Sequence, residues 1–285
     1  PGCYQKQMKD KPLTPNNELS AIELSVQYLK DNQNKNGSWG QIGVVDPAKW
    51  DYMGTTASFK TFQGATTALC CIALMETEPI GFDIQETTIN GLNYLLRTRP
   101  SRRSTPDELY SGWAVTYTTQ CLLIARDKGW LDKTGLDYDN KLKLWLKEIH
   151  KQQAIGGGWG YYDFNIGGFH PTGGGMSFTT AAAVSVLVQA RAVGFDVPDK
   201  NVNAGIKAVL RSRKPDGSYH YGTQWVLSLS SSAGKIKGSL GRAQACNYAL
   251  KVCGQNIKTQ DIIIGLNRFF RHHHFLEIAR GRPYP

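Results

Sequence analysis

Two kinds of helical segment alternate along the chain. In one kind, apolar residues recur every three or four positions and charged residues fill the remaining face, which is typical of a helix at a protein surface. The other kind is apolar on nearly all sides, which indicates a helix that is buried on most sides. We predict polar helices over 18–32, 85–98, 139–152, 200–212 and 261–274, and apolar helices over 63–76, 112–127, 177–192 and 241–253.

A short motif follows three of the polar helices, with the spacing Gln-x3-Gly-x-Trp or a variant of it. Equivalent positions after the other two polar helices lack the Gly and the Trp. The copies recur with a period of roughly 60 residues, which indicates an array of helix-pair repeats. The copies are Gln33, Gly37 and Trp39; Gln153, Gly157 and Trp159; and the weaker Arg213, Gly217 and Tyr219.

The residue types of this motif predict a structural role. Glycine ends the preceding helix. The glutamine amide can bond to backbone near the end of a neighbouring helix, and the indole can stack over that contact. We therefore interpret the motif as a device that joins consecutive repeats and not as catalytic machinery.

The repeats resemble those of the squalene and oxidosqualene cyclases and of the protein prenyltransferase β subunits, over about residues 18–275. Those families share an α/α toroid, a double-layered barrel of helix pairs. The resemblance implies an all-α fold, with one toroid domain of about four and a half helix-pair repeats over 18–285 and an extended arm over 1–17. Since the sequence stops within the fifth repeat, we expect the toroid to be incomplete at its C-terminus.

The catalytic motifs of those families do not recur in this sequence. The cyclases donate a proton from an Asp-x-Asp-Asp motif, and the nearest match, 137–140, ends in Asn and precedes a predicted helix, where Asp and Asn are expected as capping residues. The prenyltransferases hold zinc with an Asp-x-Cys pair and a distant His, and no Asp-x-Cys occurs. Three consecutive histidines at 272–274 would point in three directions from a helix. We therefore predict no metal and no cofactor.

A further group of α/α barrels, some polysaccharide lyases, uses His, Tyr and Arg as base and charge neutraliser. Residues of these types lie in the connections between predicted helices and at the start of the last apolar helix. A buried Arg there requires a partner, either an acidic residue or a bound anion. The candidate pocket residues are Asp51, Tyr52, Tyr161, Tyr162, His170, His220, Tyr221, Arg242, Gln244 and Asn247.

Charge and hydropathy narrow the range of partners. The net charge is +10, but the Lys and Arg residues are spread along the polar helices without interleaved aromatic residues, so no nucleic-acid partner is predicted. No apolar stretch reaches the length of about 20 residues that a transmembrane helix needs. The chain begins with Pro1 and not with a methionine, which favours processing and an extracytoplasmic location over a cytoplasmic one.

Three functional hypotheses follow. The first is a binding or assembly module that keeps a central pocket without cyclase chemistry and binds an apolar small molecule or a protein partner. The second is an enzyme that acts on an isoprenoid or another apolar substrate, and the third is a carbohydrate enzyme similar to a polysaccharide lyase. A dry aromatic pocket would favour a hydrocarbon ligand, because carbocations need π faces and exclusion of water. A wet groove with Arg, His and Tyr would favour a uronic-acid polymer.

Overall fold

The computed structural model describes residues 15–40, 56–100, 111–160, 174–223 and 237–272. Within these ranges the regular structure is helical and no extended strand occurs, which confirms the predicted all-α class. The polar helices are α2 (Pro15–Asp31), α4 (Gln85–Arg97), α6 (Asp139–Lys151), α8 (Asp199–Ser212) and α10 (Thr259–His272). The apolar helices are α3 (Thr56–Thr77), α5 (Ser111–Asp127), α7 (Ser177–Ala192) and α9 (Leu240–Val252), and three short 3-10 helices are η1 (Glu78–Ile80), η2 (Asp132–Thr134) and η4 (Lys237–Ser239).

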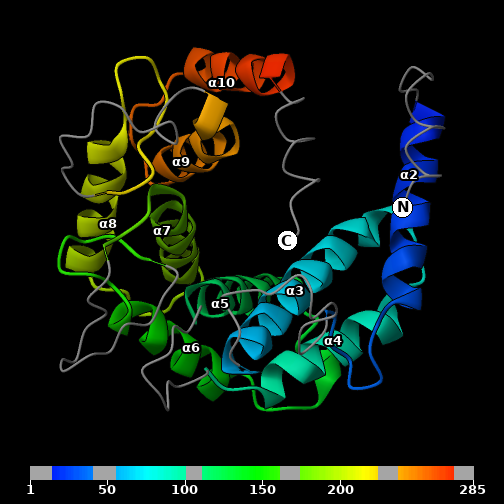
Figure 1. The fold of residues 1–285 in the computed structure, drawn as a ribbon. Coiled ribbons are helices and arrows are strands. Elements are labelled where there is room, and N and C mark those ends of the chain that lie inside the picture. The colour runs from blue at the N-terminus through cyan, green and yellow to red at the C-terminus, as the bar shows by residue number, and fades with distance from the viewer. Residues whose placement is uncertain (1–14, 41–55, 101–110, 161–173, 224–236, 273–285) are drawn as a thin grey trace.

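The helices form two layers that follow a curved path (Figure 1). In the inner layer, α3 packs against α5, α5 against α7, and α7 against α9. In the outer layer, α4, α6, α8 and α10 each pack against the inner helix that precedes them in the chain. Helix α2 lies at one end of the path and α10 at the other (Figure 1). This order is compatible with the predicted toroid, although the closed ring itself stays a prediction.

The hydrophobic pattern of the polar helices explains why they lie in the outer layer. In α6, the residues Leu142, Trp145, Leu146 and Ile149 are buried, with the spacing that places them on one face of a helix. This face packs against α5, and the charged residues of α6 occupy the remaining surface. A continuous core therefore forms between the two layers.

The inner helices contain many small buried residues. In α7, the side chains of Ala181, Ala183, Val184 and Leu187 are at most 1% exposed. Small side chains let neighbouring helices approach closely on several sides at once, so α7 can contact α5, α8 and α9 together. The nearly uniform apolar character of these segments follows from this burial.

Two predictions about the segments that precede helices are wrong, one about capping residues and one about the N-terminal arm. The N-cap of α6 is Tyr138, and no side chain caps this end, so Asp137 and Asn140 do not act as predicted. The Asn140 amide instead donates to Asp137 Oδ2 at 2.7 Å, and Asp139 lies in the first turn, where its charge favours the helix dipole. In addition, α2 begins at Pro15, inside the segment predicted to be an extended arm, because proline suits the first turn of a helix.

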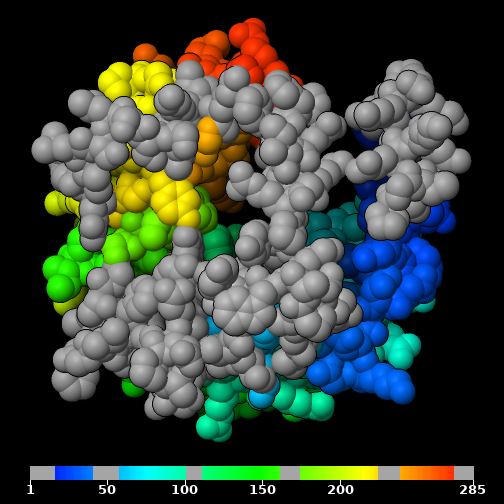
Figure 2. Space-filling view, viewed as in Figure 1, coloured from blue at the N-terminus to red at the C-terminus, as the bar shows by residue number. Residues whose placement is uncertain are grey.

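The two ends of the path lie at separate edges of one face of the molecule. Figure 2 shows α2 at the right edge and α10 at the upper edge of this face. No helix in the described ranges is both long and apolar enough to cross a membrane.

Candidate functional site

The first copy of the repeat motif connects α2 to α4. The Gln33 side-chain amide donates to the carbonyl of Gly37 at 3.0 Å and to the carbonyl of Thr87, in α4, at 2.9 Å. Gly37 has a φ of 87°, and a Cβ atom at this position would overlap the carbonyl of Asn90. Only glycine combines this backbone angle with such a close approach to the neighbouring helix.

Trp39 completes the same connection. Its side chain is 3% exposed, and its indole nitrogen donates to the carbonyl of Leu29, in α2, at 2.8 Å. Its backbone N–H donates to Thr67 Oγ1, in α3, at 3.0 Å. A Cβ atom at Gly91, in α4, would lie 2.8 Å from the indole ring. One tryptophan therefore contacts three helices, and we call this set of contacts the motif staple.

The third repeat has the same motif staple. Gln153 donates to the carbonyls of Gly157 at 2.9 Å and Asn201 at 2.8 Å, which connects α6 to α8. The indole of Trp159 donates to the carbonyl of Ile149 at 2.7 Å, and the backbone N–H of Trp159 donates to Thr180 Oγ1, in α7, at 2.9 Å. The ring also lies against a glycine of α8, Gly205.

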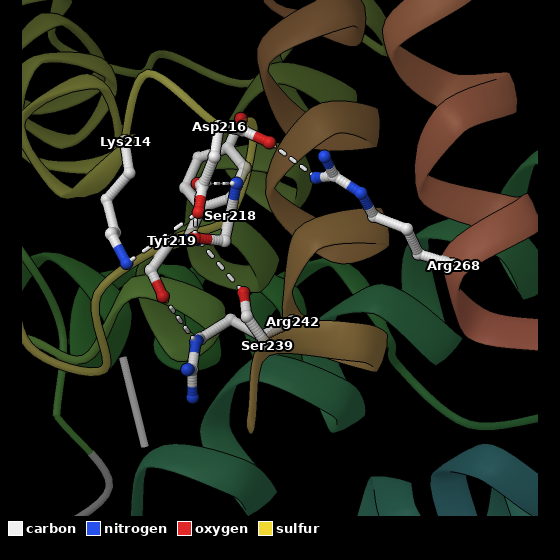
Figure 3. A network of polar contacts seen from close by, with 7 residues as sticks. All are labelled: Lys214, Asp216, Ser218, Tyr219, Ser239, Arg242 and Arg268. Atoms are coloured by element: carbon white, nitrogen blue, oxygen red, sulfur yellow. Dashed lines mark hydrogen bonds and ion pairs between the residues drawn. The ribbon is translucent and has the colours of Figure 1, made fainter. Parts of the chain in front are cut away.

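The copy in the fourth repeat, after α8, joins the same kinds of element with different chemistry. Arg213 replaces the glutamine and forms an ion pair of 3.2 Å with Asp261 of α10. Tyr219 replaces the tryptophan, and its hydroxyl donates to Asn247 Oδ1, in α9, at 2.6 Å. Figure 3 shows the polar contacts around this connection, which include a hydrogen bond from Arg268 of α10 to the carbonyl of Asp216.

A cavity of about 510 Å³ lies against the inner helices α5, α7 and α9. Along it, the rings of Tyr117 and Trp113 stack with centroids 5.7 Å apart and planes 3° apart. Phe178 of α7 lies 5.7 Å from Trp113, and Tyr221 lies 5.5 Å from Phe178. Four aromatic rings therefore form a continuous row, and we call this space the aromatic cavity.

Arg242 of α9 lies at one end of this row. Its guanidinium carbon is 5.4 Å from the centroid of the Tyr221 ring, which is within the range of a cation–π contact. Its Nε donates to the carbonyl of Tyr219 at 3.2 Å, so the motif copy after α8 holds the guanidinium in place (Figure 3). Burial lowers the pKa of Arg242 and raises that of Tyr117. Both shifts have the direction expected where water has limited access.

The structure divides the predicted pocket residues into three groups. Tyr221 and Arg242 line the aromatic cavity, whereas Asp51, Tyr52, Tyr161, Tyr162 and His170 lie outside the described residues. His220 is held through its backbone, since its N–H donates to the carbonyl of Ser212 and its carbonyl accepts from Ser177 Oγ, each at 2.7 Å.

Gln244 and Asn247 do not line the aromatic cavity. Gln244 lies against Gly265 of α10, and Asn247 accepts the bond from Tyr219. Helix geometry explains the division, because Arg242 shares a face of α9 with residues three and six positions later, Ala245 and Tyr248, and not with Gln244.

Sequence reasoning missed most of the aromatic cavity. Trp113, Tyr117 and Gln120 follow each other at helical spacing in α5, and Phe178 and Ser185 line the same cavity from α7. The available signal was a row of aromatic residues on one face of helices that are otherwise filled with small apolar side chains. It was hidden because those helices are apolar on every side.

The described residues show little conventional catalytic chemistry. No group of three or more His, Cys, Asp or Glu side chains among them could hold a metal ion. Cys246 lies in α9, and burial raises the pKa of its thiol to about 12, so this cysteine stays protonated near neutral pH. The part of the aromatic cavity formed by described residues contains no carboxyl group.

No protein-family model matches this chain. The chain is 21% identical over 238 residues to enfumafungin synthase efuA of Hormonema carpetanum, and the match covers 76% of this chain. The same match covers 17% of that synthase, so the chain spans about a sixth of the relative's length. This distant similarity and the all-helical fold fit a relationship to a cyclase-like superfamily.

Proposed function

We propose that the chain is a single helical-repeat domain related to the α/α toroids, and that its aromatic cavity binds an apolar molecule of the isoprenoid class. The observation that carries the proposal is the row of four rings from Tyr117 to Tyr221. Aromatic faces contribute large apolar areas at low conformational cost. A volume of about 510 Å³ falls within the range of ordinary small-molecule pockets.

The position of Arg242 makes one end of the aromatic cavity polar and leaves the other end apolar. An apolar chain or ring system would lie along Trp113 and Phe178, and a polar oxygen of the ligand would lie near the guanidinium. Such an arrangement binds an amphipathic isoprenoid, for example a terminal alcohol, in one direction. The proposal is therefore a binding module with an orienting cation at one end.

The distant similarity to a synthase supports a second candidate, an enzyme that acts on an isoprenoid. That candidate needs a proton donor or another electrophile beside the aromatic row. Among the described lining residues the charged group is Arg242, which is a poor acid. Binding without cyclisation is therefore the function that the described cavity supports best.

The experiment is titration of the protein with farnesol, monitored by tryptophan fluorescence. We expect saturable binding that changes the emission of Trp113, and a loss of affinity of at least tenfold in Trp113→Ala and Phe178→Ala. The matched control is Tyr28→Ala, because Tyr28 is 65% exposed on α2 and distant in sequence from the cavity helices. Product analysis of the same mixtures separates binding from cyclisation.

Other outcomes discriminate between the hypotheses. Farnesol binding that Tyr28→Ala and Phe178→Ala weaken equally would contradict a site in the aromatic cavity. Binding of oligogalacturonate, without any binding of farnesol, would favour the carbohydrate enzyme. Native mass spectrometry of gently purified protein, together with analysis of a solvent extract, would show a retained lipid or a stable assembly with a protein partner.

A further inference from the structure

Arg242 lies at a position where a helix disfavours a positive charge. It is the third residue of α9, it is half-buried, and it lines the aromatic cavity. The helix dipole places a partial positive charge at the N-terminus of a helix, so a cation in the first turn is unfavourable. The other two inner helices of this cavity, α5 and α7, each begin with four neutral residues. Helix stability therefore does not account for this arginine.

The start of α9 also differs from the starts of the outer helices. An acidic residue lies in the first turn of α4, α6, α8 and α10, whereas the described first turn of α9 contains none. The hydroxyl of the N-cap residue, Ser239, accepts the backbone N–H of Tyr219 at 2.9 Å instead of capping the helix (Figure 3). The partial charge of the helix end and the charge of the guanidinium therefore act on the same end of the cavity, and both favour an anion there.

The described contacts of Arg242 orient the guanidinium without neutralising it. The carbonyl of Tyr219, which accepts from Nε, is a neutral group, and so is the ring of Tyr221, 5.4 Å from the guanidinium carbon. Burial lowers the pKa of Arg242, but a guanidinium stays charged at neutral pH. Since it has five N–H groups, it can bind a carboxylate with two of them while it keeps the bond to Tyr219.

The charge of the cavity limits the charge of its ligand. Among the described lining residues Arg242 is the charged one, and Gln120 and Ser185 are polar but neutral. A carboxylate carries one negative charge, which one guanidinium compensates. A diphosphate carries more than one, and the excess charge would be costly beside aromatic walls. An alcohol carries none, so it gains only a hydrogen bond from a charged donor.

We propose that the aromatic cavity selects an isoprenoid carboxylate over the corresponding alcohol, with its carboxylate bound to Arg242 at the start of α9. The apolar chain lies along Trp113 and Phe178. This inference rests on the function proposed above, and it goes further because it identifies the polar group of the ligand. Arg242 is then a specificity-determining residue, whereas the aromatic row supplies the apolar contacts that an acid and an alcohol share.

The test compares four ligands of the same chain length by tryptophan fluorescence near neutral pH: farnesoic acid, its neutral methyl ester, farnesol and farnesyl diphosphate. We expect farnesoic acid to bind roughly tenfold more tightly than the ester or farnesol, because it alone forms a singly charged pair with the guanidinium. Farnesyl diphosphate should bind less tightly than the acid. Tighter binding of the diphosphate would overturn the proposal, because the site would then compensate more than one charge.

Two variants of Arg242 and one control connect this preference to the guanidinium. Arg242→Gln should abolish the preference, so that the acid and the ester bind about equally. Arg242→Lys keeps the charge without the planar fork and should retain part of the preference. The matched control is Lys251→Gln, which removes one charge from an exposed position at the other end of α9 and should leave the preference intact. An equal loss in Lys251→Gln and Arg242→Gln would show general attraction by net charge and would overturn the proposal.

The ligand series separates this inference from the function on which it rests. Saturable binding of farnesol and of the ester, without tighter binding of the acid, would overturn the choice of a carboxylate and leave the apolar site standing. Binding of none of the four ligands would contradict the proposed function and the carboxylate site together. Both results come from the unmodified protein, so neither depends on whether an Arg242 variant folds.

Discussion

The connection after α4 differs from the connections after α2 and α6 at every position of the motif staple. After α2 and α6, a tryptophan from the connection lies against a glycine of the next outer helix, Gly91 or Gly205. After α4, the sequence places Arg99 where the glutamine would be, and the tryptophan is missing. The equivalent glycine position in α6 is occupied by Trp145, because each of these residues is the seventh of its helix.

The inner helices also differ, at the residue that accepts a hydrogen bond from the motif tryptophan. Thr67 and Thr180 accept the backbone N–H of the motif tryptophans. A glycine follows each of the inner helices α3, α5 and α7, at positions 81, 129 and 194. Thr67 and Thr180 each lie 14 positions before their glycine, and the residue of α5 at the same distance is Val115. Since no motif tryptophan donates there, no hydroxyl is needed. A buried tryptophan therefore accompanies each of these three connections, supplied by the connection after α2 and α6 and by the outer helix α6 after α4, whereas a buried tyrosine, Tyr219, follows α8.

The largest expected effect is the loss of a motif tryptophan. Trp39→Ala and Trp159→Ala should each lower the free energy of unfolding by about 3 kcal/mol, because each removes a buried ring and the hydrogen bond that its indole nitrogen donates. Denaturant unfolding monitored by circular dichroism measures this, and Trp145→Ala should cost a similar amount. An unchanged unfolding midpoint in both motif variants would contradict the staple interpretation.

Moving the tryptophan of the third repeat from the connection to the outer helix would test whether the two positions are equivalent. Gly205→Ala alone should cost about 1–3 kcal/mol, because its Cβ would lie 2.8 Å from the indole ring of Trp159 and would also overlap Val184. Gly205→Trp combined with Trp159→Gly would reproduce the second connection in the third repeat. Chemical unfolding should show the double variant to be more stable than the sum of the single effects predicts. If the stability changes of the two single variants simply add in the double variant, the two tryptophan positions are not equivalent.

A substitution in the connection after α8 should change the free energy of unfolding less. Arg213→Gln removes the ion pair with Asp261, in which both side chains are about one-third exposed, 29% and 33%. We expect a loss of at most about 1 kcal/mol, and a smaller loss at high salt, because exposed ion pairs contribute little and are screened. Thermal unfolding at two salt concentrations tests this. A loss as large as that of Trp159→Ala would show that the ion pair replaces the indole in energetic terms.

The smallest effect concerns pH. Burial lowers the pKa of His150, in the last turn of α6, although the charge of Asp196 acts in the opposite direction. The unfolded chain therefore binds a proton more readily than the folded one. The stability should fall as the pH drops from the ordinary histidine pKa, about 6.5, toward the lower folded value. The thermal midpoint of His150→Gln should lose about 1–2 °C less than that of the parent protein between pH 7 and 5.5.

The sequence predicted the elements well because their signals are local. The polar helices carry a clear apolar face, as Leu142, Trp145 and Ile149 do in α6, and each predicted helix occurs in the structure within a few residues, apart from an earlier start of α3 at Thr56. The motif spacing correctly marked the connections in which Trp39 and Trp159 lie buried. The capping residues were predicted less reliably than the helix bounds, as at Tyr138, because a cap depends on how the preceding turn enters the helix.

The candidate pocket was harder to predict, because a residue lines it only if the face of the buried helix on which it lies remains uncovered. Arg242 and Gln244 are two residues apart, yet one lines the aromatic cavity and the other lies against α10. Periodicity cannot separate them in a helix that is apolar on all sides. The row formed by Trp113, Phe178 and Tyr221 joins residues from two helices and a connection, and no spacing along the chain brings them together.

The sequence alone determined the all-α class, the alternation of polar and apolar helices and the sites of the repeat motif, because each follows from residue types within one turn or one period. Only the tertiary structure decided where the aromatic cavity lies, and that Trp145, the seventh residue of α6, is buried in the core. Those features depend on the rotation of each helix about its axis. Packing against three neighbours fixes that rotation, and it is not encoded in any single segment.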